Sequence, residues 1–455
     1  MNADKRGFAL IVLSAFLCVH PRLLDAAGLR AGVARIDITP RGEIWMAGYA
    51  DRTHPSTGVV HPLWAKALAI DDGRRGRAVI ITTDLIGLPR AITDLVSARA
   101  QKEYGLERAQ LLFNSSHTHT GPVVIPVLPT MFDLAPQDRE PADQYRRRLT
   151  EDLFTAIGAA LGRLAPAQLA YGSGQVHFAI NRREPTPEGI RIGVNPSGPT
   201  DPDVPVLRVT AQDGSILAVL FGYSCHNTTL TGAFYRLSGD YAGFAQLDLE
   251  QRHPGAAAMF LELCAGDQNP NPRGRLEVAE QHGHTLASEV DRVLAEKLTP
   301  IQPPIRSAFR NIELEFATHT RETFEQELRT SEGARARRAR AMLNAYDERA
   351  AIRHILYPIQ AIRFSRDLTI LALGGEPVVD YALRAKREYR GNLMVLGYSN
   401  DVASYIPTSR VLKEGGYEAV DSMIFYGQPG PYAEDVEDRI FAGIRSVMRS
   451  VGVQP

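Results

Sequence analysis

The chain has 455 residues, with 51 basic and 52 acidic side chains and a formal net charge of -1. This balance excludes the basic excess of a nucleic-acid-binding protein, and a composition of 44% hydrophobic and 23% charged residues excludes a wholly disordered chain. Three cysteines exclude a disulfide scaffold, and the length suits either two or three domains or one large unit with insertions.

The first 28 residues have the features of a secretory signal peptide. Lys5 and Arg6 precede an apolar run at 8–19, and small residues follow at 26–28. The run is shorter than the roughly 20 apolar residues that span a bilayer, so we expect residues 1–28 to be removed and the protein to be secreted or periplasmic. A buried N-terminal helix is the alternative. No later stretch approaches transmembrane length, which predicts no integral membrane segment after signal removal.

Strands and helices are mixed along the rest of the chain. Short apolar runs predict strands at 32–38, 65–71, 77–85, 110–114, 168–171, 206–210, 217–223, 258–264 and 368–373. Helical periodicity predicts helices at 92–104, 140–163, 278–298 and 433–451, with one or two exposed, charge-rich helices at 323–355. This mixture favours an α/β (mixed α+β) architecture, with one large domain over residues 29–455 in which mixed β-sheets are flanked by helices.

Two histidines follow the apolar strand 110–114, in the segment Asn114-Ser-Ser-His117-Thr-His119-Thr-Gly-Pro. Alternate residues of a strand point to the same face, so we expect His117 and His119 to project together. On its own, such a pair is more often structural than metal-binding. Its position at a strand end, directly before Gly-Pro, is typical of a binding site.

Further loops place polar side chains after apolar strands. His226 follows one such strand, Glu376 lies on a glycine-rich turn after another, and Tyr405 precedes Tyr417 in the last loops. Two histidines and a carboxylate that leave one position open are a typical ligand set of catalytic Zn²⁺. Spacing alone does not bring these loops together, so a metal hydrolase and purely structural roles both stay open at this point.

The remaining histidines and cysteines carry weaker signals. His282 and His284 repeat the His-x-His pattern, but they fall in a predicted helix, where positions i and i+2 diverge by about 200°. Cys225 and Cys264 each end an apolar run, and the sequence is compatible both with a disulfide between them and with two free buried thiols.

The order and wording of these segments resemble the neutral/alkaline (non-lysosomal) ceramidase family, whose members are zinc-dependent amidases that cleave the N-acyl bond of ceramide. The resemblance covers about residues 32–426. Its motifs are Gly32-Val-Ala-Arg-Ile-Asp-Ile-Thr-Pro40 with Met46-Ala-Gly48-Tyr49, His117-Thr-His119-Thr-Gly-Pro, Asn181-Arg182, Cys225-His226, Ser238-Gly239-Asp240, Gly375-Glu376 and Tyr405-Ile-Pro-Thr. It implies a zinc ion held by His117, His226, Glu376 and Tyr405.

The resemblance also implies roles for the residues around the metal. His119 and Arg182 would stabilise the oxyanion or bind the leaving group, and Tyr417 and Asn269 would position the substrate. Gly48 belongs to the family's substrate-lining loop. Asp267 is expected near the substrate as well, although a turn-forming role is the plainer interpretation of this residue.

Two features depart from the family pattern. The family segment GDxSPN reads Gly266-Asp267-Gln268-Asn269-Pro270-Asn271 in this chain, so Asn269 stands where the family has a serine at the metal centre. An amide cannot act as an activated nucleophile, although it can orient a water molecule through hydrogen bonds. The family usually continues into a C-terminal β-sandwich, and we expect this chain to lack it.

These observations favour a secreted zinc-dependent hydrolase of sphingolipid metabolism. It would use metal-activated water to cleave the amide (N-acyl) bond of a ceramide-like lipid or another N-acylated substrate. Its partner would be a small molecule or a lipid, and not a nucleic acid. Two alternatives keep the same scaffold: hydrolysis of a glycosidic or ester bond in carbohydrate processing, and a non-catalytic binding protein that contains zinc.

Overall fold

The computed structural model describes residues 28–366 and 368–455. The predicted signal peptide, except for its last residue, lies outside the described residues. Within the described part of the chain, no helix combines the length and the apolar character needed to cross a membrane.

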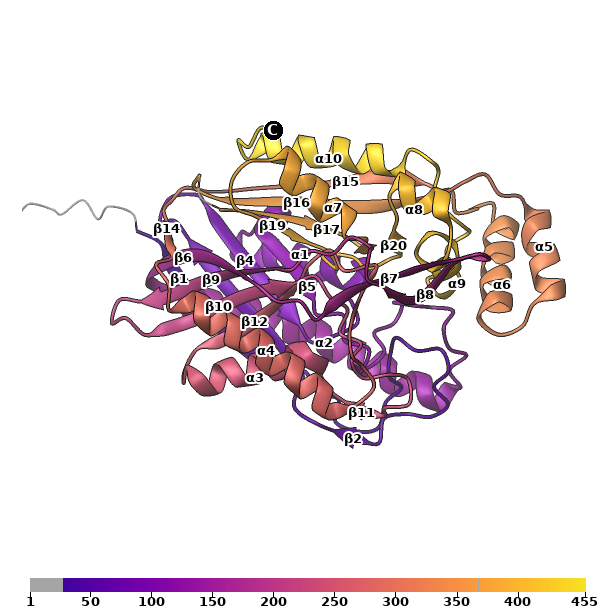
Figure 1. The fold of residues 1–455 in the computed structure, drawn as a ribbon, viewed down its shortest axis with the longest axis horizontal. Coiled ribbons are helices and arrows are strands. Elements are labelled where there is room, and N and C mark those ends of the chain that lie inside the picture. Colours follow the sequence, from indigo (N-terminus) through magenta and orange to yellow (C-terminus); the bar gives the residue numbers. More distant parts are fainter. Residues whose placement is uncertain (1–27, 367) are drawn as a thin grey trace, which may run out of the picture.

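The largest sheet has nine strands, and neighbours in the sheet are often distant in sequence (Figure 1). In order across the sheet, the strands are β12 (Ala257–Glu262), β10 (Ile216–Tyr223), β9 (Asp203–Ala211), β6 (Ala165–Gln175), β1 (Arg30–Asp37), β3 (Trp64–Asp71), β4 (Arg77–Thr83) and β5 (Leu111–Ser115), and β14 (Thr299–Ile301) pairs with β6. Most pairs in this sheet are antiparallel, but β4 with β5 and β10 with β12 are parallel.

A second sheet packs on one face of the first. Its four strands, in order, are β15 (Ile305–Glu315), β16 (His354–Phe364), β17 (Leu368–Leu373) and β19 (Leu393–Leu396). Ile80 and Leu220 of the large sheet share a buried cluster with Ile370 of the small sheet. Their sequence neighbours Ile81 and Phe221 belong to other clusters, because successive side chains of a strand point to opposite faces.

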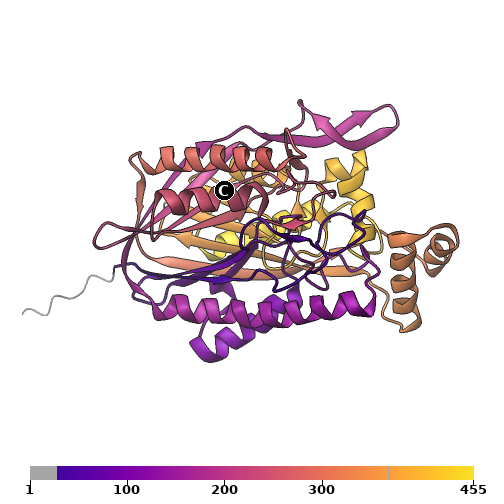
Figure 2. The same ribbon diagram turned by 90° about the horizontal axis from the view of Figure 1, so that it is seen from below.

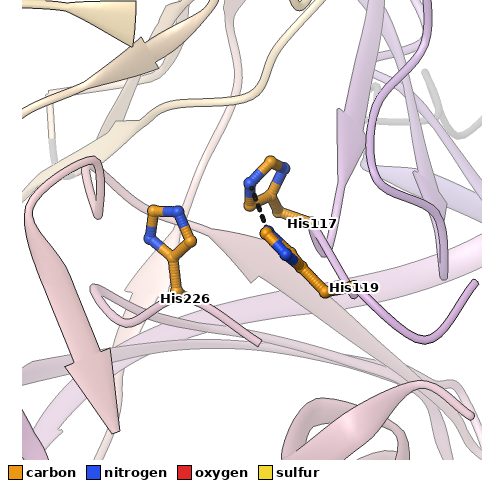
Figure 3. Close-up of side chains that lie close together, drawn as sticks. All are labelled: His117, His119 and His226. Atoms are coloured by element: carbon orange, nitrogen blue, oxygen red, sulfur yellow. Dashed lines mark hydrogen bonds between the residues drawn. The ribbon is translucent and has the colours of Figure 1, made fainter. Parts of the chain in front are cut away.

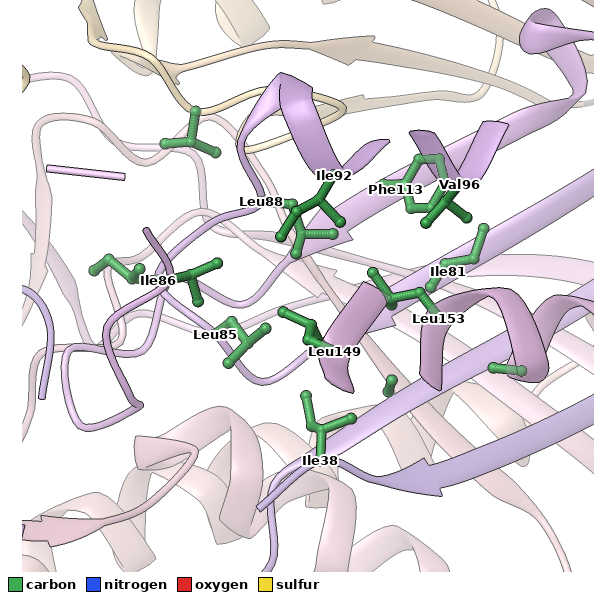
Figure 4. Packing of buried hydrophobic residues seen from close by; sticks show 14 of the residues in the cluster. Ile38, Ile81, Leu85, Ile86, Leu88, Ile92, Val96, Phe113, Leu149 and Leu153 are labelled. Carbon is green, nitrogen blue, oxygen red and sulfur yellow. The ribbon is translucent and has the colours of Figure 1, made fainter. Parts of the chain in front are cut away.

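Helices cover the outer faces of both sheets. They are α1 (Arg90–Tyr104), α2 (Pro136–Gly162), α3 (Asp240–Arg252), α4 (Leu276–Leu294), α7 (Asp380–Glu388) and α10 (Val436–Ser450). Ile92 and Val96 of α1 and Leu149 of α2 pack with Ile81 and Phe113 of the large sheet (Figure 4). Helices α3 and α4 cover its other half, and Figure 2 shows the two helix pairs on opposite sides of the molecule. Helices α7 and α10 cover the four-stranded sheet.

Short elements fill the end of the molecule to which most of the predicted site loops belong. They are β2 (Gly58–Val59), β7 (Ala179–Thr186), β8 (Gly189–Asn195), β11 (Arg236–Leu237), β13 (Gln268–Pro270), β18 (Glu376–Pro377), β20 (Tyr405–Ile406), the helices α8 (Ser409–Glu414) and α9 (Ser422–Phe425), and a π-helix (Tyr417–Asp421). A 3₁₀ helix (Arg108–Gln110) lies instead at the amino end of β5. The hairpin formed by α5 (Arg321–Thr330) and α6 (Gly333–Asp347) projects from the same end (Figure 1).

Parallel pairing brings the chemistry-bearing loops together. The pairs β4–β5, β10–β12 and β17–β19 are parallel, so the carboxyl ends of each pair lie side by side. Isolated bridges from Asn114 to Ser399 and from Leu263 to Leu396 connect these ends to one another. The segments that follow β5, β10 and β17 carry His117, His226 and, at the start of β18, Glu376. Ligands of α/β sheets commonly bind outside the carboxyl ends of strands.

The mixed α/β fold class predicted from the sequence is confirmed. Each predicted strand is present within a few residues, and the charge-rich segment 323–355 forms α5 and α6 before β16 begins at His354. Among the elements that were not predicted are α3, α7, β15, β16, β19 and the β7–β8 hairpin.

Candidate metal centre and active site

His117 and His119 lie just beyond the strand rather than on it. Strand β5 ends at Ser115, and His117 has a left-handed backbone with φ of 58°. Strand alternation therefore does not apply, and the reason given for expecting the two side chains to meet was wrong. They do meet, because the turn brings their Nε2 atoms to 3.1 Å from each other. A positive φ at a residue other than glycine is uncommon and is found preferentially at functional sites.

His226 and Glu376 complete the centre. Nε2 of His117 lies 3.0 Å from Oε2 of Glu376, and Nε2 of His226 lies 3.1 Å from the same oxygen. One ring nitrogen from each of His117, His119 and His226 lies within 4.8 Å of the other two, and Figure 3 shows the three imidazoles gathered around one space. These three histidines form a possible metal site.

Backbone carbonyl groups fix the tautomers of two of these histidines. Nδ1 of His117 lies 2.6 Å from the carbonyl oxygen of Ile86, and Nδ1 of His226 lies 2.8 Å from that of Ala265. Because a carbonyl oxygen only accepts, each Nδ1 is the donor and each Nε2 presents a lone pair. Oε2 of Glu376 is buried and receives no hydrogen bond. Three acceptor atoms therefore converge, namely the two Nε2 lone pairs and Oε2 of Glu376, and such an arrangement suits a cation.

Two tyrosines hold the carboxylate and the histidine in place. Glu376 and Tyr405 are direct partners in the parallel pair of β18 and β20. The Tyr405 hydroxyl lies 3.0 Å from Nε2 of His226. The Tyr426 hydroxyl donates to Oε1 of Glu376, so Oε2 is the oxygen left for the centre. Tyr426 was missed by the sequence analysis.

Burial and neighbouring groups shift the pKa values of Glu376, His226 and His119. Burial would raise the pKa of Glu376, but His117 and His226 hold it well below its usual value. Burial lowers the pKa of His226 to about 4, and the Arg182 charge acts in the same direction. Burial, together with the two other imidazoles, also lowers the pKa of His119 well below its usual value. A carboxylate and neutral imidazoles are the forms that bind a divalent metal.

Arg182 reaches the centre from β7. Its Nη2 donates to the Tyr405 hydroxyl at 3.0 Å, and its Nη1 lies 3.3 Å from Nε2 of His226 and 3.4 Å from Oδ1 of Asn269. Burial alone would lower the pKa of Arg182, but Tyr405 and Glu418 raise it well above its usual value. Arg182 is therefore a fixed positive charge beside the centre.

Glu418 balances that charge, and the sequence analysis did not select it. Oε1 of Glu418 lies 2.8 Å from Nε of Arg182, and Oε2 lies 2.6 Å from Nη1 of Arg183. Arg183 also pairs with Glu414 at 3.0 Å. Burial would raise the pKa of Glu418, but the two arginines hold it below its usual value. Glu418 directly follows Tyr417, but nothing in the local sequence connects it with Arg182, 236 positions away.

Tyr417, Asn269 and Gly48 lie beside the centre. The Tyr417 ring lies 5.4 Å from the Tyr405 ring, and the Arg182 guanidinium lies 5.6 Å from the Tyr417 ring. Gly48 has φ of 93°, and a Cβ on it would lie 2.4 Å from the His119 imidazole. Only glycine lets this loop approach His119 so closely.

Asp267 lies behind the centre, and the expectation that it contacts substrate is corrected. The side chain is fully buried. One oxygen accepts from Nδ2 of Asn181 at 2.8 Å, and the other accepts from the backbone N–H of Val379 at 2.9 Å. The Asp267 backbone carbonyl accepts from the backbone N–H of Arg182 at 2.8 Å. Because its acceptors are occupied, Asp267 positions the Arg182 segment.

Among the described residues, His282, His284 and the two cysteines lie outside the metal group of His117, His119 and His226. His282 lies 2.9 Å from the carbonyl oxygen of Pro272, and His284 pairs with Asp248 at 3.0 Å on the exposed side of α4. Cys225 and Cys264 are free, buried thiols, which decides between the two alternatives that the sequence left open.

The chain is similar in sequence to known proteins. The sequence profile described as "Neutral/alkaline non-lysosomal ceramidase, N-terminal" matches residues 29–334. The neutral ceramidase of Pseudomonas aeruginosa is 26% identical over 284 residues, which cover 59% of this chain and 41% of that protein. The neutral ceramidase of Drosophila melanogaster is 24% identical over 292 residues, covering 60% of this chain and 40% of that protein. The aligned part is thus about two fifths of the length of these curated relatives.

Solved structures share the fold. A crystal structure of neutral ceramidase from Pseudomonas aeruginosa superimposes with a TM-score of 0.72 at 20% sequence identity, over 94% of this chain and 75% of that one. A ceramidase complexed with C2 gives a TM-score of 0.70 at 19% identity, over 90% of this chain and 73% of that one. Because the family profile matches most of this chain and the fold agrees, the chain belongs to the neutral/alkaline non-lysosomal ceramidase family.

Proposed function

We propose that this protein is a zinc-dependent hydrolase that cleaves the amide bond of a ceramide-like lipid or another N-acylated substrate, outside the cytoplasm. The observation that supports it best is the convergence of two imidazole lone pairs and an unpaired carboxylate oxygen within 3.0–3.1 Å. Histidine nitrogens and a carboxylate are the ligands that zinc prefers in catalytic sites. A zinc ion held there would polarise the amide carbonyl and lower the pKa of a water molecule.

In this proposal His117, His226 and Glu376 hold the ion, with the Tyr405 hydroxyl as a further ligand. His119 differs from the other two histidines. Its Nδ1 has no hydrogen-bond partner, so no carbonyl fixes its tautomer, and its side chain is only partly buried. We therefore place His119 on the open side, where its neutral ring can accept or deliver a proton at Nε2.

Arg182 would stabilise the negative charge that develops on the carbonyl oxygen. Its guanidinium is held by Glu418 and directs Nη1 and Nη2 towards His226 and Tyr405. A donor fixed in this way is worth about 3–4 kcal/mol of transition-state stabilisation in known enzymes. Tyr417 lies on the same side and would contact the substrate next to the reacting bond.

Asn269 favours direct attack by water over an acyl-enzyme intermediate. Its Oδ1 lies 3.4 Å from both Nη1 of Arg182 and the Thr228 hydroxyl, so the amide is anchored as an acceptor. It has no hydroxyl that could carry an acyl group. Asn269 would instead hold Arg182 and orient the attacking water.

An apolar wall beside the centre suits an acyl chain. Trp45 lies three residues before Gly48, and its carbonyl oxygen accepts from the N–H of Val123, just beyond the His117–Pro122 segment. The Trp45 ring packs on Phe132 with centroids 5.1 Å apart, and both side chains are only partly buried. Such partly exposed aromatic rings offer an apolar contact surface next to the reacting groups.

The test is hydrolysis of a panel of N-acyl substrates, including ceramides, by protein loaded with zinc. We expect turnover that a chelator abolishes and added zinc restores. His117→Ala should abolish it, whereas His284→Ala, which removes the exposed histidine of α4, should leave it unchanged. The proposal fails if the zinc-loaded protein hydrolyses no substrate of the panel, or if His117→Ala retains full turnover.

A further inference from the structure

Two arginines beside the centre have no carboxylate partner. Arg52 is only 4% exposed, and its guanidinium donates to backbone carbonyl oxygens, that of His119 among them at 2.9 Å. Arg273 is partly buried and donates from Nη2 to the Tyr49 hydroxyl at 2.8 Å, while its Nε is buried without a hydrogen bond. Within residues 28–366 and 368–455, neither arginine forms an ion pair with Asp or Glu.

Tyr49 connects both arginines to the centre. Its ring meets the His119 ring edge-on, with centroids 4.9 Å apart. The Arg52 guanidinium lies over the Tyr49 ring at 5.1 Å, and Arg273 binds the hydroxyl of the same ring. The Tyr49 hydroxyl donates its own proton to the carbonyl oxygen of Leu230 at 3.0 Å. The two guanidinium groups therefore flank one ring that is in contact with His119.

On this side, no carboxylate of the described residues forms an ion pair with either guanidinium group. Burial raises the pKa of Tyr49 to about 12, so its phenol is uncharged at neutral pH. Burial lowers the pKa of Arg52 only to about 10, so it stays a cation. On the opposite side, Arg182 and Arg183 are matched by Glu418 and Glu414. Burying an unmatched charge is unfavourable unless an anion joins it.

We infer that the N-acylated substrate carries an anionic oxygen group, such as a carboxylate, which Arg273 binds on the Tyr49 side of the centre. This inference rests on the proposed amide hydrolysis and narrows its substrate class, because ceramide itself is uncharged. Within the described protein, Arg273 donates a hydrogen bond only from Nη2. A planar guanidinium with further N–H groups to donate is well suited to binding an oxyanion. Both terminal nitrogens of Arg52, Nη1 and Nη2, donate to carbonyl oxygens, and its remaining donor, Nε, is buried, so Arg52 positions the loop and adds positive potential.

The test compares two amides that differ in one group. N-dodecanoylglycine and N-dodecanoylethanolamine have the same acyl chain and the same kind of amide, and differ in a carboxylate against a hydroxyl. We expect the wild-type protein to prefer the glycine conjugate by about tenfold or more in kcat/KM. Arg273→Gln should remove the preference, mainly through KM. Arg275→Gln, at an exposed arginine two residues away, removes the same charge and should leave the preference unchanged.

A binding experiment separates this inference from the proposed function. Calorimetry would measure the affinity of dodecanesulfonylglycine and of dodecanesulfonylethanolamine, which are not hydrolysed as amides. We expect the charged compound to bind about tenfold more tightly, and Arg273→Gln to abolish that difference. Charge-selective binding without turnover would contradict only the proposed hydrolysis. Turnover or binding of both compounds with equal efficiency, unchanged in Arg273→Gln, would overturn the inference.

Discussion

The two sides of the histidine centre carry arginines in opposite electrostatic settings. On one side, Arg182 and Arg183 contact Glu418 and Glu414, so each cation has an anion. On the other side, Arg52 and Arg273 surround the uncharged Tyr49 and have no such partner among the described residues. The first side is complete without a ligand and can hold the reacting groups rigidly. On the second side, the charges of Arg52 and Arg273 gain an anionic partner only when an anion binds. We therefore expect this side to select the substrate.

The largest effect is expected from Glu376→Gln, at the carboxylate that lies between the two sides. Glutamine keeps the shape but removes the charge that both imidazoles face at 3.0–3.1 Å. We expect zinc affinity to fall and kcat/KM to fall by about 10³-fold or more. Zinc titration and steady-state kinetics check this. Wild-type turnover in the variant would exclude Glu376 as a ligand.

Breaking the matched side should destabilise the fold. Glu418→Gln leaves two buried guanidinium groups without their shared carboxylate. We therefore expect the free energy of unfolding to fall by about 3–5 kcal/mol. Urea denaturation measures this change. Glu414→Gln, at the partly exposed partner of Arg183, should lower the free energy of unfolding by clearly less. Equal, small effects of both variants would show that the network does not carry the charge balance assigned to it.

Acid should weaken the metal-free protein through His226. The unfolded chain binds a proton at this imidazole below about pH 6.5, while the folded chain does so only near pH 4. The stability from the neutral ring is therefore present above pH 6.5 and is lost as pH falls towards 4, by up to about 3 kcal/mol. Urea midpoints measured between pH 4 and 7 should show a steeper decline for wild type than for His226→Gln. Parallel curves would contradict this assignment.

A moderate effect is expected from Asn269→Ser. Serine has a shorter side chain, so its hydroxyl oxygen would lie too far from Arg182 and Thr228 to accept the hydrogen bonds that Oδ1 of Asn269 accepts. We expect kcat/KM on the substrate that the wild type prefers to drop by about tenfold, with little gained on ceramide. A gain of several orders of magnitude on ceramide, without loss on any other substrate, would indicate that the asparagine simply disables an ancestral serine mechanism.

The smallest effect is expected on the side of Arg52 and Arg273, where the arginines have no carboxylate partner among the described residues. Arg273→Gln removes a partly buried cation that has no anionic partner, so we expect stability to change by less than about 1 kcal/mol, or to rise. The same substitution at Arg182 should destabilise the protein more, because it removes one of the two buried cations that Glu418 contacts. Comparing the two urea midpoints tests the contrast between the sides directly.

Sequence reasoning predicted the elements with strong local patterns. Apolar runs gave the buried strands, and α4 and α10 have clear helical periodicity. Helix α3 was missed because its buried face includes Gly243 and Gln246, which interrupt the apolar spacing. The β7–β8 hairpin was missed because β8 is mostly exposed and its side chains are mixed in character.

The residues of the site can also be separated into those that a local sequence pattern indicates and those that it does not. His117, His226 and Glu376 could be selected because each follows an apolar strand, although only the resemblance joined them into one centre. Glu418 and Tyr426 could not be selected by local pattern, because their roles depend on contacts with residues 236 and 50 positions away. Long-range pairing of this kind has no signature in a single sequence.

The most direct test of the whole account is the metal content of the purified protein after loading with zinc and dialysis, measured by native mass spectrometry. The account predicts one zinc ion per chain in the wild type and in His284→Ala, and almost none in the double variant His117→Ala/His226→Ala. A wild-type protein that retains no zinc, or a double variant that retains a full equivalent, would contradict it.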